Sequence, residues 1–158
     1  MTYISKPYII CLAMLLWLAA PLTASAQILP DLDRLEGKNL YDSYAGKTID
    51  GIYKRPRERS GTHQFTESFK ADGTTFYREG EFTQKGRWFI ENGDVVCFTY
   101  NENGATTAKH CFAIFESGTC QYAYSLNNMR NGKPIHSNAW TAKTLAHGEI
   151  SSCNNLIS

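Results

Sequence analysis

The stretch "GRWFIENGDVVCFTY", Gly86 to Tyr100, contains two short apolar runs on either side of Asn92-Gly93. Asn and Gly tolerate the positive φ that a tight hairpin turn requires. Each run is rich in β-branched and aromatic residues, as strands usually are. The stretch therefore predicts an antiparallel hairpin, in which Gly86 allows close backbone approach at the start of a strand and Trp88 supplies buried core area.

The sequence around this hairpin repeats the same pattern from Thr62 to Leu126. The other runs are "THQFTESF", "TTFYREGEF", "KHCFAIFE" and "CQYAYSL", and the other turn signals are Asp72-Gly73, Asn103-Gly104 and Ser117-Gly118. No segment between the runs is long enough for the helix that joins parallel strands. A meander of this kind must hide its edges. We therefore expect a mainly β fold, an antiparallel meander that closes as a small calycin-like barrel or packs as a sandwich.

A short helix is expected ahead of the sheet. In the segment Ile28 to Leu40, Leu32 and Leu35 are three residues apart. Asp31 can cap the start of a helix there and Gly37 can end it. After the helix, a first strand is expected over Ile49 to Tyr53, interrupted by Gly51.

The chain turns polar beyond Leu126. Asn131-Gly132 is a further hairpin signal, and "PIHSNAW" is the strand expected after it. From Thr141 onward the sequence predicts a tail that a disulfide at Cys153 would hold to the sheet.

The N-terminus has the three-part layout of a secretory signal peptide. Lys6 supplies positive charge, Ile9 to Ala20 is apolar, and Ala24-Ser25-Ala26 is a small-residue cleavage site. Pro21 cuts the run short of the about 20 apolar residues that span a membrane. We expect residues 1–26 to be removed and residues 27–158 to form one β domain. The protein would be periplasmic or secreted, with no stable membrane anchor after cleavage.

The charge of this mature chain is balanced. Removing Lys6 leaves equal numbers of basic and acidic residues. Such a chain has no long-range attraction for nucleic acid or for an anionic membrane, so neither is an expected partner. The one basic cluster, "KRPRER" from Lys54 to Arg59, is interpreted as a solvated loop or strand end because Pro56 opposes central strand pairing.

The mature chain keeps four cysteines, Cys97, Cys111, Cys120 and Cys153. An even number in an exported chain predicts disulfides. No two are spaced two to four residues apart, so a structural zinc site is not expected. Cys97 and Cys111 lie symmetrically about Gly104 and would face each other across a hairpin, which leaves Cys120 for Cys153.

No catalytic motif is present, and we expect neither a catalytic residue, a metal nor a cofactor. His110 is next to Cys111, but neighbours on a strand point to opposite faces. Glu79 and Glu81 flank Gly80 and would share one strand face. Two carboxylates could act on a glycan, yet same-face charges on a half-exposed strand usually form the solvent side.

The aromatic residues of the strands are the candidate ligand contacts. A small barrel with an aromatic interior can hold an apolar or planar ligand. The same rings could also simply fill the core. The candidate ligand-lining residues are Trp88, Phe98, Tyr100, Phe112, Tyr122 and Tyr124.

Four segments, in order, resemble a broad group of uncharacterised exported small β-proteins of alphaproteobacteria. These are "LEGKNL", "GRW", "DVVCF" with Cys97 and "HCFAIF" with Cys111, within Leu35 to Phe115. The resemblance implies an extracytoplasmic antiparallel β domain with a disulfide between these two cysteines, and it implies no activity. The Gly-x-Trp of Gly86 to Trp88 is also similar to the lipocalin motif, although that motif begins the first barrel strand and this one follows several strands.

These observations favour a non-catalytic binding domain for a small apolar ligand or a protein partner. The alternatives are a hydrolase of envelope glycans, which needs two carboxylates converging in a cleft, and an inhibitor of a host enzyme such as lysozyme. A structural envelope protein without a small-molecule site is the third. A concave aromatic pocket would favour ligand binding, and a protruding polar loop on a closed core would favour an inhibitor.

Overall fold

A computed structural model describes residues 32–102, 105–106, 109–149 and 153. The expected signal peptide, residues 1–26, lies outside the described residues. Among the residues that are described, no helix has the length and apolar character needed to cross a membrane.

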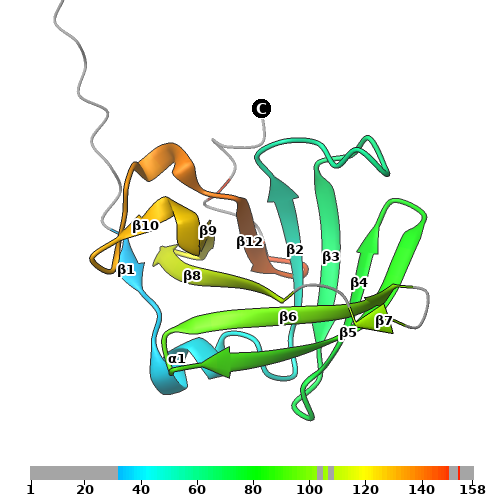
Figure 1. The fold of residues 1–158 in the computed structure, drawn as a ribbon, viewed down its shortest axis with the longest axis horizontal. Coiled ribbons are helices and arrows are strands. Elements are labelled where there is room, and N and C mark those ends of the chain that lie inside the picture. The colour runs from blue at the N-terminus through cyan, green and yellow to red at the C-terminus, as the bar shows by residue number, and fades with distance from the viewer. Residues whose placement is uncertain (1–31, 103–104, 107–108, 150–152, 154–158) are drawn as a thin grey trace, which may run out of the picture.

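Eight antiparallel strands form a closed barrel (Figure 1). The barrel strands are β2 (Thr48–Tyr53), β3 (Gln64–Phe69), β4 (Thr74–Glu79), β5 (Phe82–Glu91), β6 (Val95–Glu102), β8 (His110–Ser117), β9 (Cys120–Ser125) and β12 (Ala142–Ala146). Consecutive strands from β2 to β6 pair as a meander, and β12 pairs with both β2 and β9. The pairing of β6 with β8 completes the closure. Of the two expected architectures, the barrel is confirmed.

The remaining elements are short. They are β1 (Asp33–Arg34), α1 (Gly37–Asp42), β7 (Ala105–Thr106), β10 (Met129–Arg130), β11 (Lys133–Pro134), and the 3-10 turns Leu126–Asn128 and Ser137–Ala139. The expected tail is wrong in part, because its first residues form β12. The strand expected in "PIHSNAW" is limited to Lys133–Pro134, and Ser137–Ala139 is a helical turn.

The short helix exists but begins where it was expected to end. Residues Asp33–Arg34 pair with the edge of β8, and the Leu35 N–H donates to the Ile114 carbonyl at 2.9 Å, so this segment is extended. Gly37, with φ of 53°, is the first residue of α1 instead of a C-terminal cap. The helix brings Leu40 and Tyr44 against the end of the barrel, where both are buried.

The expected hairpin turns are present where they are described. Asn92 and Gly93 both have positive φ (53° and 77°), and Asn131-Gly132 repeats that geometry between β10 and β11. Asn103-Gly104 lies outside the described residues. Gly80, with φ of 60°, also makes a turn, so "TTFYREGEF" divides into β4 and β5.

The central quoted stretch is a hairpin, with one difference from expectation. Trp88 is buried, as predicted, with 3% of its surface exposed. Gly86 lies in the middle of β5, directly opposite Tyr100. A Cβ at Gly86 would lie 2.6 Å from the Tyr100 ring, so glycine leaves the space that this ring occupies.

Two disulfides lie outside the barrel wall. Cys97 faces Cys111 in the β6–β8 register and is bonded to it, and Cys120 is bonded to Cys153. These are the two pairs expected from the symmetric hairpin. Cys97, Cys120 and Cys153 belong to an outer apolar cluster that also contains Phe115, Tyr122 and Tyr124.

Candidate functional site

The barrel encloses a cavity of about 440 Å³, here called the lumen. At one end Tyr44, which follows α1, contributes to its floor, and the neighbouring Leu40 is fully buried. The loop between β2 and β3 lies at the opposite end of the barrel (Figure 1). Its Arg57 and Arg59 line the cavity with side chains 48% and 32% exposed, so they form the rim.

Aromatic side chains are the largest group in the lumen wall. Tyr44 follows α1, and the others lie at inward positions on strands: Tyr53, Phe65, Tyr77, Phe98, Tyr100 and Phe112. Phe65 stacks between Tyr53 and Tyr77, with ring centroids 4.6 and 5.7 Å away. Gly51 makes this stack fit, because a Cβ there would lie 2.3 Å from the Phe65 ring. Gly51 is therefore part of strand β2, not a break in it.

Glu67 is the acidic residue that lines the lumen, and it is 4% exposed. Its Oε1 accepts hydrogen bonds from the Thr75 hydroxyl at 2.7 Å and the Tyr100 hydroxyl at 2.8 Å. Burial raises the pKa of Glu67 to about 7, although both hydrogen bonds favour the carboxylate. The carboxyl group can therefore gain or lose its proton near neutral pH.

Glu79 is also buried, and it is already paired. Arg59 contacts its Oε2 at 3.0 Å, and the hydroxyls of Ser60 and Tyr77 donate to the carboxylate. Burial alone would raise the pKa of Glu79, but these hydrogen bonds and the Arg59 charge outweigh it and the pKa is lowered. The expectation that Glu79 and Glu81 share a solvent face is wrong, because the turn at Gly80 separates them and Glu81 is exposed.

The structure brings together three of the six sequence-predicted ligand contacts. Phe98, Tyr100 and Phe112 line the lumen. Trp88 lies inside the barrel but deeper, packed on Tyr44 and Phe69.

Tyr122 and Tyr124 do not line the lumen and belong to the outer cluster. On β9, Ala123 faces inward, so its neighbours Tyr122 and Tyr124 must face outward.

Sequence reasoning missed several lumen residues, above all Glu67. A signal was present, because Phe65, Glu67 and Phe69 alternate on β3 and share one face. An apolar face that contains one glutamate marks a buried carboxyl group. The basic cluster at Lys54 to Arg59 is a loop, as expected, but two of its arginines line the lumen rim.

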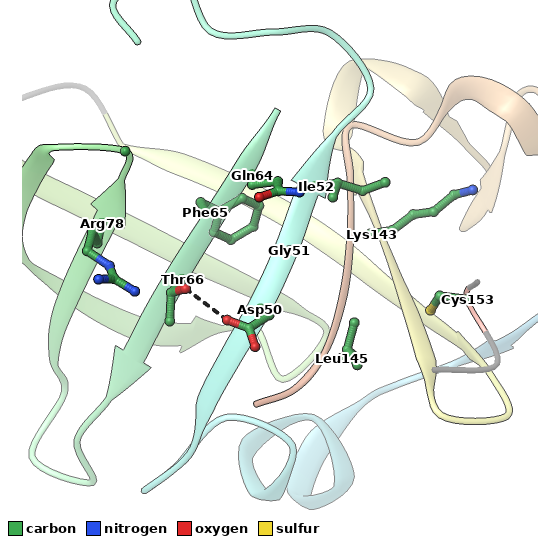
Figure 2. A pocket seen from close by; sticks show the side chains of 11 residues that line it. Asp50, Gly51, Ile52, Gln64, Phe65, Thr66, Arg78, Lys143, Leu145 and Cys153 are labelled. Atoms are coloured by element: carbon green, nitrogen blue, oxygen red, sulfur yellow. Dashed lines mark hydrogen bonds between the residues drawn. The ribbon is translucent and has the colours of Figure 1, made fainter. Parts of the chain in front are cut away.

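A second depression of about 390 Å³, here called the outer groove, lies on the outside of the barrel (Figure 2). It crosses β3, β2 and β12, with Thr66 and Asp50 on one side and Lys143 and Cys153 on the other. The Thr66 hydroxyl donates to Asp50 at 2.8 Å, and His147 contacts the same carboxylate at 2.6 Å. The Asp50 carboxylate of this groove thus already has two interaction partners, Thr66 and His147.

Lys143 is the buried cation beside the outer groove. Its ammonium lies 4.2 Å from the Trp140 ring centroid and 5.3 Å from that of Tyr122. Burial lowers the pKa of Lys143 to about 8, and the nearby Lys54 acts in the same direction. The two rings occupy the space around the ammonium.

Glu91 lies beside the sulfurs of Cys97 and Cys111, the one grouping among the described residues with metal-ligand spacing. Those sulfurs are bonded to each other and are not thiolates. The grouping therefore has a single free ligand, Glu91, which already pairs with Lys109 at 2.7 Å.

Comparison of the chain with protein-family models, curated proteins and solved structures finds no match. The resemblance to exported alphaproteobacterial β-proteins therefore stays a prediction.

Proposed function

We propose that this protein is a non-catalytic binding protein of the periplasm or the cell exterior, and that it holds a small ligand in the lumen of its barrel. The observation that carries the proposal is the cavity of about 440 Å³, lined by rings and by one carboxyl group. Small-molecule sites in proteins are typically about 300 to 1,000 Å³, mostly apolar, with a few polar groups that orient the ligand. The lumen has this composition.

The carboxylates favour binding over glycan hydrolysis. A glycosidase places two carboxyl groups on either side of the scissile bond. Here Glu67 lines the lumen, but Glu79 is fully buried and held by Arg59, Ser60 and Tyr77. A substrate in the lumen would meet one available carboxyl group. That arrangement can recognise a ligand, but it does not supply the acid and the second carboxylate together.

The disulfides support an extracytoplasmic location, since such bonds persist in oxidising compartments. The expected signal peptide at residues 1–26 points the same way. A protein partner remains the competing proposal, and the ring-lined lumen is the observation that favours a small molecule.

The proposal is tested by determining whether the purified protein retains a bound small molecule. Native mass spectrometry of protein exported by its own host should show a bound small molecule that is released on unfolding. Two substitutions at neighbouring positions of β12 provide the control. Thr144 lines the lumen and Leu145 lines the outer groove, so Thr144→Phe fills one cavity and Leu145→Phe the other.

We expect Thr144→Phe to lose the ligand and Leu145→Phe to keep it, with both variants folded by circular dichroism. Equal retention by both variants would contradict the lumen as the binding site. A pull-down from the same extract that captures a stoichiometric protein partner, with no small molecule in the wild type, would favour the competing proposal.

A further inference from the structure

The two carboxyl oxygens of Glu67 differ in their hydrogen bonding. Both hydrogen bonds of its carboxyl group, from Thr75 and Tyr100, are made to Oε1. Within the described residues Oε2 has no hydrogen-bond partner, and no arginine, lysine or histidine forms an ion pair with this residue. A buried carboxylate with a free oxygen is costly unless a donor reaches it.

The groups around Glu67 are mainly aromatic rings. From the adjacent elements, Tyr44, Tyr53, Tyr77 and Tyr100 face the lumen beside it, and burial raises the pKa of all four, which therefore stay neutral. The ring faces of tyrosine and phenylalanine carry negative potential and attract cations. The aromatic wall and the Glu67 carboxylate thus both favour a positively charged ligand.

The rim of the lumen carries positively charged side chains, in contrast to the Glu67 carboxylate. Arg57 and Arg59 share one carboxylate, Glu79, with Arg59 at 3.0 Å and Arg57 at 3.9 Å. His110, which also lines the cavity, is exposed. The Arg57 side chain is about half exposed, so salt and water screen its field. Glu67 is 4% exposed and acts at short range, where a charge-assisted hydrogen bond is stronger than at the exposed rim. We therefore expect Glu67, and not Arg57, to set the preference for ligand charge.

We propose that the lumen ligand is a small organic amine whose ammonium group donates to Oε2 of Glu67 while its apolar body contacts the surrounding rings. This inference rests on the proposed function, because it names the class of ligand for the same lumen. The carboxylates beside the rim and in the outer groove are already paired, Glu79 with Arg59 and Asp50 with Thr66.

The amine would bind more tightly at higher pH. An ammonium ion stabilises the Glu67 carboxylate, so binding lowers the pKa of Glu67 from about 7 and releases a proton below that pH. Glu79 is already ionised by its partners, and the four tyrosines are neutral across this range, so Glu67 is the lumen carboxyl group that responds. Affinity for the amine should fall by about tenfold between roughly pH 8 and pH 6.

Three probes with the same phenol ring test the inference: tyramine, which carries an ammonium group, 4-ethylphenol, which is neutral, and 3-(4-hydroxyphenyl)propionate, which is an anion. Calorimetric titration of the mature protein near pH 8 should show tyramine binding at least about tenfold more tightly than the other two. Glu67→Gln keeps the shape of the side chain and removes its charge. In that variant the preference should shrink to within about threefold and the pH dependence should disappear.

The outcomes separate the two claims. If 4-ethylphenol or the anion binds the wild type as tightly as tyramine, or if Glu67→Gln leaves the preference unchanged, the amine inference is wrong and the lumen site stands. If none of the three binds at millimolar concentration, the amine inference is wrong, and the proposed function is then decided separately by whether the wild type retains a small molecule that Thr144→Phe loses. A thermal melt of Glu67→Gln near pH 8 provides the folding control, and we expect it to match or exceed the wild type.

Discussion

The outer groove uses outward positions of strands whose inward positions line part of the lumen, and we propose only the lumen as a ligand site. On β3, Phe65 and Glu67 face the lumen while Gln64 and Thr66 lie toward the groove. On β12, Thr144 and Leu145 divide in the same way. The two sites have similar volumes, so size does not distinguish them.

The difference lies in enclosure. Asp50 of the outer groove has a side chain 39% exposed and two partners, Thr66 and His147. Glu67 is 4% exposed, and its Oε2 has no hydrogen-bond partner within the described part of the chain. Because a polar group gains more from a hydrogen bond where it is shielded from water, we expect the lumen to discriminate between ligands better than the groove. Strand alternation therefore determines on which side of the barrel wall a carboxylate lies. The degree of enclosure determines how strongly that carboxylate can interact with a ligand.

The largest effect should come from opening the closed end of the lumen. Trp88 packs on Tyr44 and Phe69, and its Nε1–H donates to the Lys70 carbonyl at 2.8 Å. Trp88→Ala should lower the free energy of unfolding by about 4 kcal/mol. Leu145→Ala, a half-buried groove residue, should cost about 1 kcal/mol. Urea unfolding measures both, and equal losses would show that the two regions contribute alike to the core.

Removing the disulfide beside the outer groove should have the next largest effect. It joins Cys120 to Cys153 across 33 residues, and Cys153 is one wall of the groove. The double variant Cys120→Ala/Cys153→Ala should lose about 3.7 kcal/mol, mainly because its unfolded chain is less constrained. Tyramine affinity should change by less than about threefold. A loss of ligand binding in a variant that stays folded would place the ligand nearer the groove.

The smallest effect concerns pH. The pKa of Glu67 is raised by burial to about 7 from an ordinary 4.5, so the folded state binds this proton more tightly than the unfolded chain. The stabilisation from the bound proton is complete below about pH 4.5 and is lost as the pH rises through 7, by up to about 3 kcal/mol. The pKa of Glu79 is lowered, so its contribution is lost only at more acid pH.

Urea unfolding between about pH 5 and pH 8 checks this slope in the wild type and in Glu67→Gln. The variant should be flatter over that interval. Leu145→Ala is the control in the groove, because it removes no titratable group, and its curve should stay parallel to that of the wild type. A wild-type slope that Glu67→Gln leaves unchanged would assign the titration to another group.

The fold was largely predictable because turn signals and strand alternation are local properties. Asn92-Gly93, the symmetric cysteines and the aromatic runs are each sufficient to specify hairpins. Closure of the barrel by β12 was not predictable, since the segment Ala142–Ala146 lacks aromatic residues and its pairing with β2 and β9 is long-range. Gly80 was misread because Glu79 and Glu81 suggested continuous alternation across it.

The site was less predictable than the fold. Aromatic content pointed to Phe98, Tyr100 and Phe112, but it could not separate them from Tyr122 and Tyr124, which lie on the other face of the wall. The curvature of the closed barrel determines which face of β9 points inward. No local sequence pattern predicts that curvature. Two partners of Glu79, Arg59 and Ser60, come from a loop 20 and 19 residues away, and no local pattern predicts these contacts.

Methyl NMR during titration with tyramine near pH 8 tests most directly whether the lumen is the ligand site. Lumen and groove methyl groups alternate on β12, where Ala142 and Thr144 line the lumen and Leu145 lines the groove, so each set acts as a control for the other. The lumen probes are Ile114, Ala123, Ala142 and Thr144, and the groove probes are Ile52, Thr66 and Leu145. We predict saturable shifts of the lumen methyl signals with the groove signals unmoved. Shifts confined to Ile52, Thr66 and Leu145 would contradict the proposed site.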